Sequence, residues 1–179
     1  MPALDQLQNA VLDVANSQRR TFYGKYRAIV TDNNDTDQQQ GRIKVKVPQL
    51  FDDDETDWAL PCVPYATNGH GFYVMPEVND TVWVEFEAGD PSRPIWTGCW
   101  WPQSQAPQLK PEQKQFETAG GQHILLDDSS GSMQIEIKDG NGNTVTLSSS
   151  GIVLECSGGK IEISSSGVSI NDGALMVTS

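Results

Sequence analysis

Hydrophobic residues follow two different periods along this chain. Near the N-terminus they recur at spacings of three and four, which predicts a helix over residues 3–18 of a segment formed by residues 1–20. The narrow apolar stripe of this helix consists of Leu4, Leu7, Val11 and Val14. Such a stripe fits a helix packed on its own domain and equally a helix that docks on a neighbouring protein.

Between residues 21 and 103 the period falls to two, which is the period of a strand. Ile43, Val45 and Val47, for example, alternate with basic residues. Five strands are expected, at residues 23–31, 41–47, 58–63, 81–87 and 94–101. Short strands separated by Gly and Pro turns predict a five-stranded OB-fold barrel. Its expected core comprises Val45, Val47, Val82, Val84 and Phe86.

A second repetitive region follows a predicted linker at residues 104–116, which is rich in Pro and Gln. Between residues 117 and 179, pairs of apolar residues two positions apart alternate with Gly, Ser and Asn breaks. The pairs are Ile124/Leu126, Ile135/Ile137, Val145/Leu147, Ile152/Leu154, Ile161/Ile163, Val168/Ile170 and Leu175/Val177. From Val145 onward they start 7, 9, 7 and 7 residues apart, a short period that predicts stacked β units.

Two inward side chains per strand are too few to build a core within one chain. Three chains that each add a strand to every layer would bury them around one axis, with the Gly and Ser breaks at the corners. An intertwined trimeric β-helix or β-prism stalk is therefore favoured over a single-chain solenoid. The seven apolar pairs are its expected core. Strand edges at its end would be open, so Leu175, Met176, Val177, Thr178 and Ser179 are expected to bind a separate capping partner.

Composition narrows the function without changing this architecture. The formal net charge is -12, and both the barrel and the stalk are acidic, which argues against a nucleic-acid surface. The three cysteines Cys62, Cys99 and Cys156 have no CxxC spacing and are expected to be buried free thiols. No apolar run reaches the roughly 18 residues of a membrane span, and the N-terminus does not look like a signal peptide. Synthesis in the cytoplasm without a signal peptide is expected.

Catalytic chemistry is not indicated by the motifs. His70 and His123 lie outside any HExxH, GxSxG or Cys/His pattern, and the acidic run at residues 52–55 lacks the spaced ligands of a calcium loop. No catalytic residue, cofactor or metal is therefore expected. Trp83, Trp96, Trp100 and Trp101 fit core and interface packing better than a base-stacking platform.

The strand motifs resemble the baseplate assembly protein V family, the central spike proteins of contractile phage tails and related injection systems. The resemblance is carried by residues 23–33 (YGKYRAIVTDN), 41–48 (GRIKVKVP), 58–65 (WALPCVPY), 82–91 (VWVEFEAGDP) and 94–101 (PIWTGCWW). In the stalk it is carried by residues 118–128 (TAGGQHILLDD) and 135–143 (IEIKDGNGN). The plan is also similar to the valine-glycine repeat spikes of type VI secretion.

The resemblance implies an OB-fold against a baseplate hub or tail tube, a homotrimeric β-helix stalk and a small conical, PAAR-like tip protein. Leu4, Leu7, Val11 and Val14 would then dock on the hub. The expected function is a non-enzymatic spike that transmits force and pierces an envelope, with transient contact to the target membrane, as part of a phage tail or tail-like particle. The linker leaves no room for the lysozyme domain of some phage spikes. The alternative is an OB-fold module that binds oligosaccharide or single-stranded nucleic acid and carries an oligomerising tail.

Overall fold

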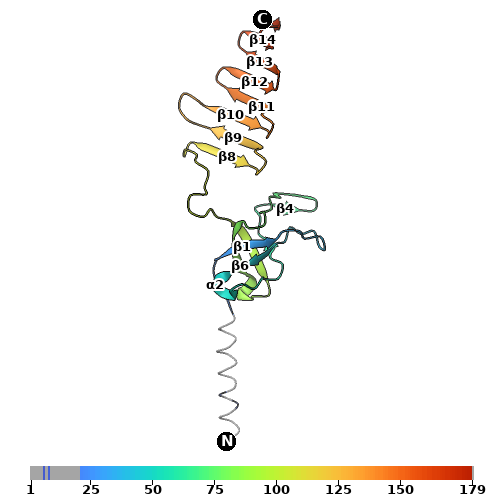
Figure 1. Ribbon diagram of the computed structural model, residues 1–179, viewed down its shortest axis with the longest axis vertical. Coiled ribbons are helices and arrows are strands. Elements are labelled where there is room, and N and C mark those ends of the chain that lie inside the picture. Colours follow the sequence, from blue (N-terminus) through green and yellow to red (C-terminus); the bar gives the residue numbers. More distant parts are fainter. Residues whose placement is uncertain (1–5, 7, 9–20, 179) are drawn as a thin grey trace. The chain divides into compact units, whose positions relative to one another are not determined.

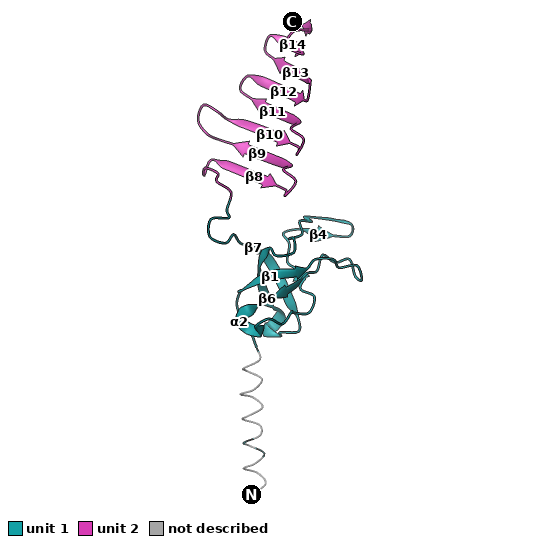
Figure 2. Cartoon of the chain, viewed as in Figure 1, with its two compact units in different colours: residues 1–106 teal, residues 107–179 magenta. Residues whose placement is uncertain are grey.

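The chain forms two compact units, Met1–Ala106 (unit 1) and Pro107–Ser179 (unit 2), which are coloured separately in Figure 2. The computed structural model describes Gln6, Gln8 and residues 21–178 (Figure 1). The apolar stripe of the expected N-terminal helix lies outside the described residues, as does Ser179. Whether that helix docks on another protein therefore stays a prediction.

Unit 1 is a small barrel with the strand connections of an OB-fold. Its hydrogen-bonded order is β2-β1-β6-β7-β3, antiparallel except for the parallel β3–β7 pair. Bridges from Ile43 to Ala59 and from Lys46 to Glu55 join β2 to the segment before β3, which closes the ring. The strands are β1 (Tyr26–Asp32), β2 (Lys44–Lys46), β3 (Leu60–Pro61), β6 (Thr81–Phe86) and β7 (Pro94–Cys99). The predicted OB-fold is confirmed.

The barrel core lies inside this ring and is made by the alternating residues of the strands. All five expected core residues are buried there, because period-two alternation sends every second side chain to the same face. Ala28, Val30, Ile43, Ala59 and Trp96 complete the core. Unit 1 thus has an apolar core of its own, without help from another chain.

Two short elements of unit 1 were not expected from the sequence. Pro48 begins the helix α2 (Pro48–Phe51), and η1 (Glu87–Gly89) is a 3-10 turn. The Gly-containing loop is a hairpin of β4 (Ala66–Thr67) and β5 (His70–Gly71). Both elements are a single turn or shorter, and such segments carry too few residues to show a period.

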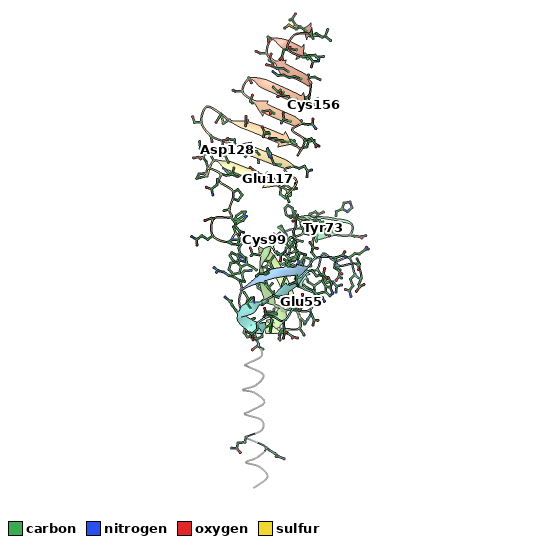
Figure 3. The ribbon with its side chains drawn as sticks, in the orientation of Figure 1. Glu55, Tyr73, Cys99, Glu117, Asp128 and Cys156 are labelled. Carbon is green, nitrogen blue, oxygen red and sulfur yellow. The ribbon has the colours of Figure 1, made fainter. Side chains whose placement is uncertain are left out.

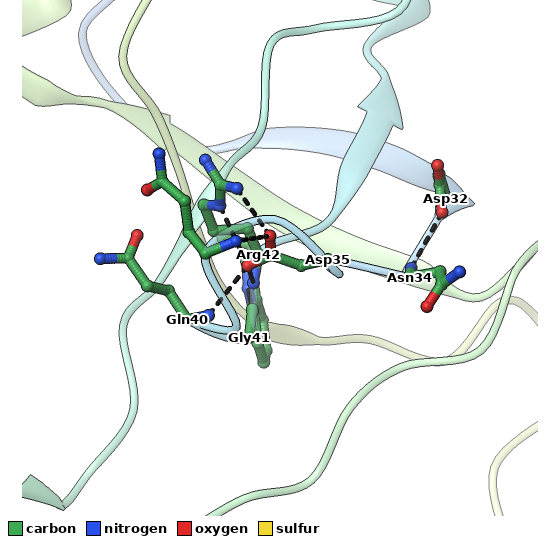
Figure 4. Close-up of polar contacts among 8 residues, drawn as sticks. Asp32, Asn34, Asp35, Gln40, Gly41 and Arg42 are labelled. Atoms are coloured by element: carbon green, nitrogen blue, oxygen red, sulfur yellow. Dashed lines mark hydrogen bonds and ion pairs between the residues drawn. The ribbon is translucent and has the colours of Figure 1, made fainter. Parts of the chain in front are cut away.

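A buried ion pair holds the long loop between β1 and β2 (Figure 4). Arg42 donates to both carboxylate oxygens of Asp35, at 2.6 Å and 3.0 Å, and the backbone N–H of Gln40 donates to the same carboxylate at 2.9 Å. The side chain of Asp35 is only 4% exposed. The Arg42 guanidinium, with the backbone N–H donors, holds the pKa of Asp35 well below its usual range.

Unit 2 is one antiparallel sheet of eight strands, in which each strand pairs with the next along the chain (Figure 1). Its connections run from two residues between β12 and β13 to six between β9 and β10, and the strands stack in sequence order. The strands are β8 (Gln113–Glu117), β9 (His123–Asp127), β10 (Gln134–Lys138), β11 (Thr144–Ser148), β12 (Gly151–Cys156), β13 (Gly159–Ser164), β14 (Gly167–Ile170) and β15 (Leu175–Val177). The strand β8 corrects the predicted linker at residues 104–116, because its first four residues fall within that segment.

The Ser-Ser-Ser-Gly breaks of unit 2 have a structural role. Gly151 and Gly167 open β12 and β14 with φ of +138° and +125°, values that residues with a side chain rarely adopt. A Cβ at Gly151 would lie 2.0 Å from the carbonyl oxygen of Ile163, and one at Gly167 would lie 2.1 Å from that of Val177. Glycine therefore allows adjacent strands to approach at these two breaks.

The expectation of buried cysteines was wrong for the chain by itself. Cys62, Cys99 and Cys156 are all free and exposed; Figure 3 shows Cys99 on β7 and Cys156 on β12. Cys99 and Cys156 lie in strands and Cys62 directly follows β3, yet all three side chains are exposed. Local alternation shows that a residue lies on one face of a strand, not whether that face is buried.

Replacing Asp35 with Asn removes the anionic partner of Arg42. Because the pKa of Asp35 is lowered in the folded state, its carboxylate stabilises the barrel above about pH 4, and this contribution is lost as the pH falls through the folded pKa. The variant should unfold at a lower urea concentration than wild type at neutral pH, and the difference should shrink on acidification. Tryptophan fluorescence reports on unit 1, where all five tryptophans lie.

The matched control is Asp37→Asn, which removes a charge from the same loop and leaves the Asp35 hydrogen bonds in place. It should keep the wild-type midpoint. Equal urea midpoints for wild type and Asp35→Asn at neutral pH would contradict a stabilising role for the ion pair.

Candidate trimer interface

One face of the unit 2 sheet carries two continuous ladders of apolar side chains. Residues paired across antiparallel strands point to the same face, and the pairing joins each strand to the next without a shift in register. The first ladder is Phe116, Ile124, Ile137, Val145, Leu154, Ile161, Ile170 and Leu175. The second is Leu126, Ile135, Leu147, Ile152, Ile163, Val168 and Val177. We call these side chains the apolar face.

The apolar face is not covered by any described part of unit 2. Twelve of its fifteen side chains are exposed, from 37% at Ile161 to 61% at Val177, and Val145, Val168 and Ile170 are half-buried. Phe116, Ile124, Ile137 and Val145 line a groove at its β8 end. Soluble proteins rarely leave an apolar surface of this continuity in water. The geometry therefore requires a partner along the whole length of the sheet.

All fourteen residues predicted for the stalk core lie on this one face, in register. Their burial around a trimer axis remains a prediction. Sequence reasoning missed Phe116, which begins the first ladder and pairs with Ile124, and Lys114, which precedes Leu126 in the second. Residues 113–117 contain a single apolar residue, Phe116, so the sequence shows no apolar pair that would identify this strand.

The opposite face of the sheet is polar and carries ion pairs. His123 on β9 contacts Glu136 on β10, with 2.7 Å between Nε2 and Oε1. Lys160 lies 3.2 Å from the carboxylate of Glu162 and 3.6 Å from that of Asp172. The hydrogen bond to Glu162 raises the pKa of Lys160. Charged side chains thus lie on one face of the sheet and the apolar ladders on the other.

A carboxylate organises the turn between β10 and β11. Asp139 accepts hydrogen bonds from the backbone N–H groups of Asn141 and Asn143, both at 2.9 Å, and from the side-chain amide of Asn143 at 2.6 Å. These hydrogen bonds, led by that of the Asn143 side chain, lower the pKa of Asp139. The Asp-Gly-Asn-Gly-Asn sequence thus builds a fixed corner between two strands.

The residues predicted for tip binding are divided between the two faces. Leu175 and Val177 continue the two ladders, whereas Met176 pairs with Ser169 on the opposite face. All three are strongly exposed, at 58–61%. Thr178 follows β15 and Ser179 lies outside the described residues. Leu4, Leu7, Val11 and Val14, predicted to dock on a hub, also lie outside them.

The tryptophans of unit 1 are mostly engaged by other groups. Trp96 is buried in the core and donates from Nε1 to the carbonyl oxygen of Gly41 at 3.2 Å. The Arg27 guanidinium lies over Trp83 and Trp100, 5.8 Å and 4.7 Å from their ring centres. These rings therefore do not form a free stacking platform. Trp101 is 67% exposed.

The part of the chain that the structure describes contains neither a candidate metal site nor a membrane-spanning helix. Within it, no group of three or more His, Cys, Asp or Glu side chains is arranged to hold a metal ion. His70 is exposed in β5, with Nδ1 2.9 Å from the carbonyl oxygen of Asn68. In the same residues, no helix has the length and apolar character needed to cross a membrane.

Each of the two units matches a known protein family. Residues 26–101 match the type VI secretion system/phage-baseplate injector OB domain. Residues 114–176 match the phage baseplate V C-terminal trimerisation domain. The two matches together cover more than three quarters of the chain, whereas no curated protein matches it significantly. The chain belongs to the phage baseplate and type VI secretion spike family.

Family membership confirms the resemblance seen in the sequence and adds a partner for the apolar face. This is a family of structural spike and baseplate proteins rather than of known enzymes, and it assembles into phage tail-like particles. The trimerisation domain supports a homotrimer. It coincides with the sheet that carries the apolar face, so copies of the same chain are the partner that the geometry requires.

Replacing Leu154 with Lys places an ammonium group on the apolar face, three in one layer of a trimer. Burying an unpaired charge costs on the order of several kcal/mol, so the trimer should be lost at micromolar concentration. Native mass spectrometry measures the loss directly.

The matched control is Val153→Lys, one residue away on β12. Val153 points to the polar face and pairs with Thr146 and Glu162, so an added lysine there should leave the trimer intact. Wild-type assembly of Leu154→Lys would show that the apolar face is not the interface.

Proposed function

We propose that this protein is the homotrimeric central spike of a contractile injection baseplate, which transmits axial force and pierces the target envelope. The observation that carries the proposal is the apolar face of unit 2, fifteen side chains in two ladders without a break in register. Three such faces around one axis make a shaft in which every layer is held by identical side chains.

Such a shaft is suited to transmit force for a physical reason. Each layer couples three chains, so bending or unfolding one layer must separate side chains of all three from one another. The fixed turn at Asp139 and the close strand approaches at Gly151 and Gly167 limit the ways in which the strands can slide. The stalk is accordingly a rigid element and needs no catalytic group.

The ends of the spike carry the proposed partners. Unit 1 would bind the baseplate hub or tail tube, with Leu4, Leu7, Val11 and Val14 of the N-terminal segment as a docking stripe. Leu175, Met176, Val177, Thr178 and Ser179 would carry a conical, PAAR-like tip protein, because the apolar side chains among them are 58–61% exposed. Contact with the target membrane would be transient. The acidic charge of the chain argues against nucleic acid as a partner.

Complementation of a tail-like particle that lacks this chain tests the proposal. Wild-type protein and the Val153→Lys control should restore sheathed particles with a central spike in electron micrographs, together with delivery into target cells. Leu154→Lys, which cannot form the shaft, should restore neither. Particles that contract and deliver cargo equally well without the chain would contradict a role as the spike.

A further inference from the structure

Residues 58–76 form the longest stretch of the chain without Asp, Glu, Lys or Arg, in a protein of net charge -12. The stretch contains β3, the β4–β5 hairpin and residues 72–76, which follow the hairpin. Five of its large apolar side chains are 42–77% exposed: Leu60, Tyr65, Phe72, Tyr73 and Val74. We call these five side chains the hairpin surface. Its lack of charge and its exposed aromatic rings are typical of the centre of a protein interface.

The hairpin has little support within its own chain. Each strand has two residues, and the backbone N–H of Phe72 donates to the carbonyl oxygen of Tyr65 at 2.9 Å. A two-stranded hairpin of this size is marginally stable in water. Beneath it is an open cavity of about 780 Å³, lined on the barrel side by Gly41, Met75 and Trp96. Exposed rings beside an open apolar cavity leave room for a side chain from outside.

The distribution of charge in unit 1 favours a second copy of the chain as the partner that binds the hairpin surface. Residues 1–103 carry 15 acidic and 8 basic side chains, so most contacts between two barrels would bring acidic groups together and be unfavourable. The five side chains of the hairpin surface carry no charge, so this surface can approach the acidic barrel of another copy without repulsion. A basic partner, in contrast, would be expected to select an acidic surface.

The trimeric stalk also brings the copies close together. Residues 100–112 join β7 to β8 and span at most about 45 Å when fully extended. A tether of this length raises the effective concentration of one barrel near the next to roughly millimolar. A weak contact between barrels is sufficient under these conditions.

We infer that the hairpin surface packs against the barrel of a neighbouring copy, so that the three barrels form a ring of their own. The inference rests on the homotrimer of the proposed function. It assigns to unit 1 a second interface between copies of the chain, separate from the apolar face of unit 2.

Hydrogen exchange of the full chain tests the inference. In the wild-type trimer the backbone amides of residues 66–73 should exchange at least about tenfold more slowly than in the monomeric Leu154→Lys variant, because burial of the hairpin suppresses its local opening. Equal exchange rates in trimer and monomer would overturn the inference, and would leave the hairpin surface free for a baseplate hub protein.

Two tyrosine variants provide a matched comparison within the trimer. Tyr73 is 77% exposed on the hairpin surface, and Tyr23 is 74% exposed outside it; each ring lies beside a glycine, Gly41 and Gly89 respectively. Tyr73→Glu should bring the exchange of residues 66–73 to the monomer rate while the mass stays trimeric. Tyr23→Glu should keep the wild-type protection. Unchanged protection in Tyr73→Glu would overturn the inference.

The outcomes separate the inference from the proposed function. A Leu154→Lys variant that remains trimeric counts against the spike shaft, and the tyrosine comparison still decides whether the hairpin surface is an interface. A wild-type trimer with unprotected hairpin amides counts against the hairpin contact alone.

Discussion

The structure depends on one constraint: unit 2 cannot bury its own apolar side chains. Its eight strands form a single sheet in sequence order, and no second layer among the described residues of unit 2 covers it. Each strand contributes at most two apolar residues to one face, so folding the sheet back on itself would give a core only two side chains wide. When identical chains associate, their apolar faces cover one another, so no further protein segment is needed to remove this surface from water.

The two units differ in how they bury apolar side chains: unit 1 encloses a core, whereas unit 2 leaves its apolar face largely exposed. The barrel closes through the Ile43–Ala59 and Lys46–Glu55 bridges and encloses its own core. It can serve as a preformed platform for partners. The described residues of unit 2 enclose no such core, so in the proposed trimer the stability of the stalk is inseparable from association. In the proposed spike each layer belongs to three chains, which would make the shaft rigid.

Period-two alternation in the sequence predicted most of this architecture. It located the five barrel strands and the five expected core residues, since a half-buried strand must alternate. It also predicted fourteen of the fifteen residues of the two ladders, whose alignment on one face depends only on strand parity and register. The family then followed from motifs such as residues 82–91 and 94–101.

Other features could not be predicted because they depend on contacts that are distant in sequence. The ion pair of Asp35 with Arg42 forms only when the loop folds back on itself. Strand β8 contains a single apolar residue, Phe116, and is recognisable only through its pairing with β9. The exposure of the cysteines depends on which face lacks a cover, and alternation does not show this. The β4–β5 hairpin is too short to have a period.

The central claim is that identical chains cover the apolar face, and the mass of the purified full-length protein in solution tests it most directly. Multi-angle light scattering should give about 59 kDa, three times the chain mass of 19.6 kDa, and this value should not change on hundredfold dilution from about 10 µM, as expected for an obligate assembly. A mass of one chain at these concentrations would contradict the account.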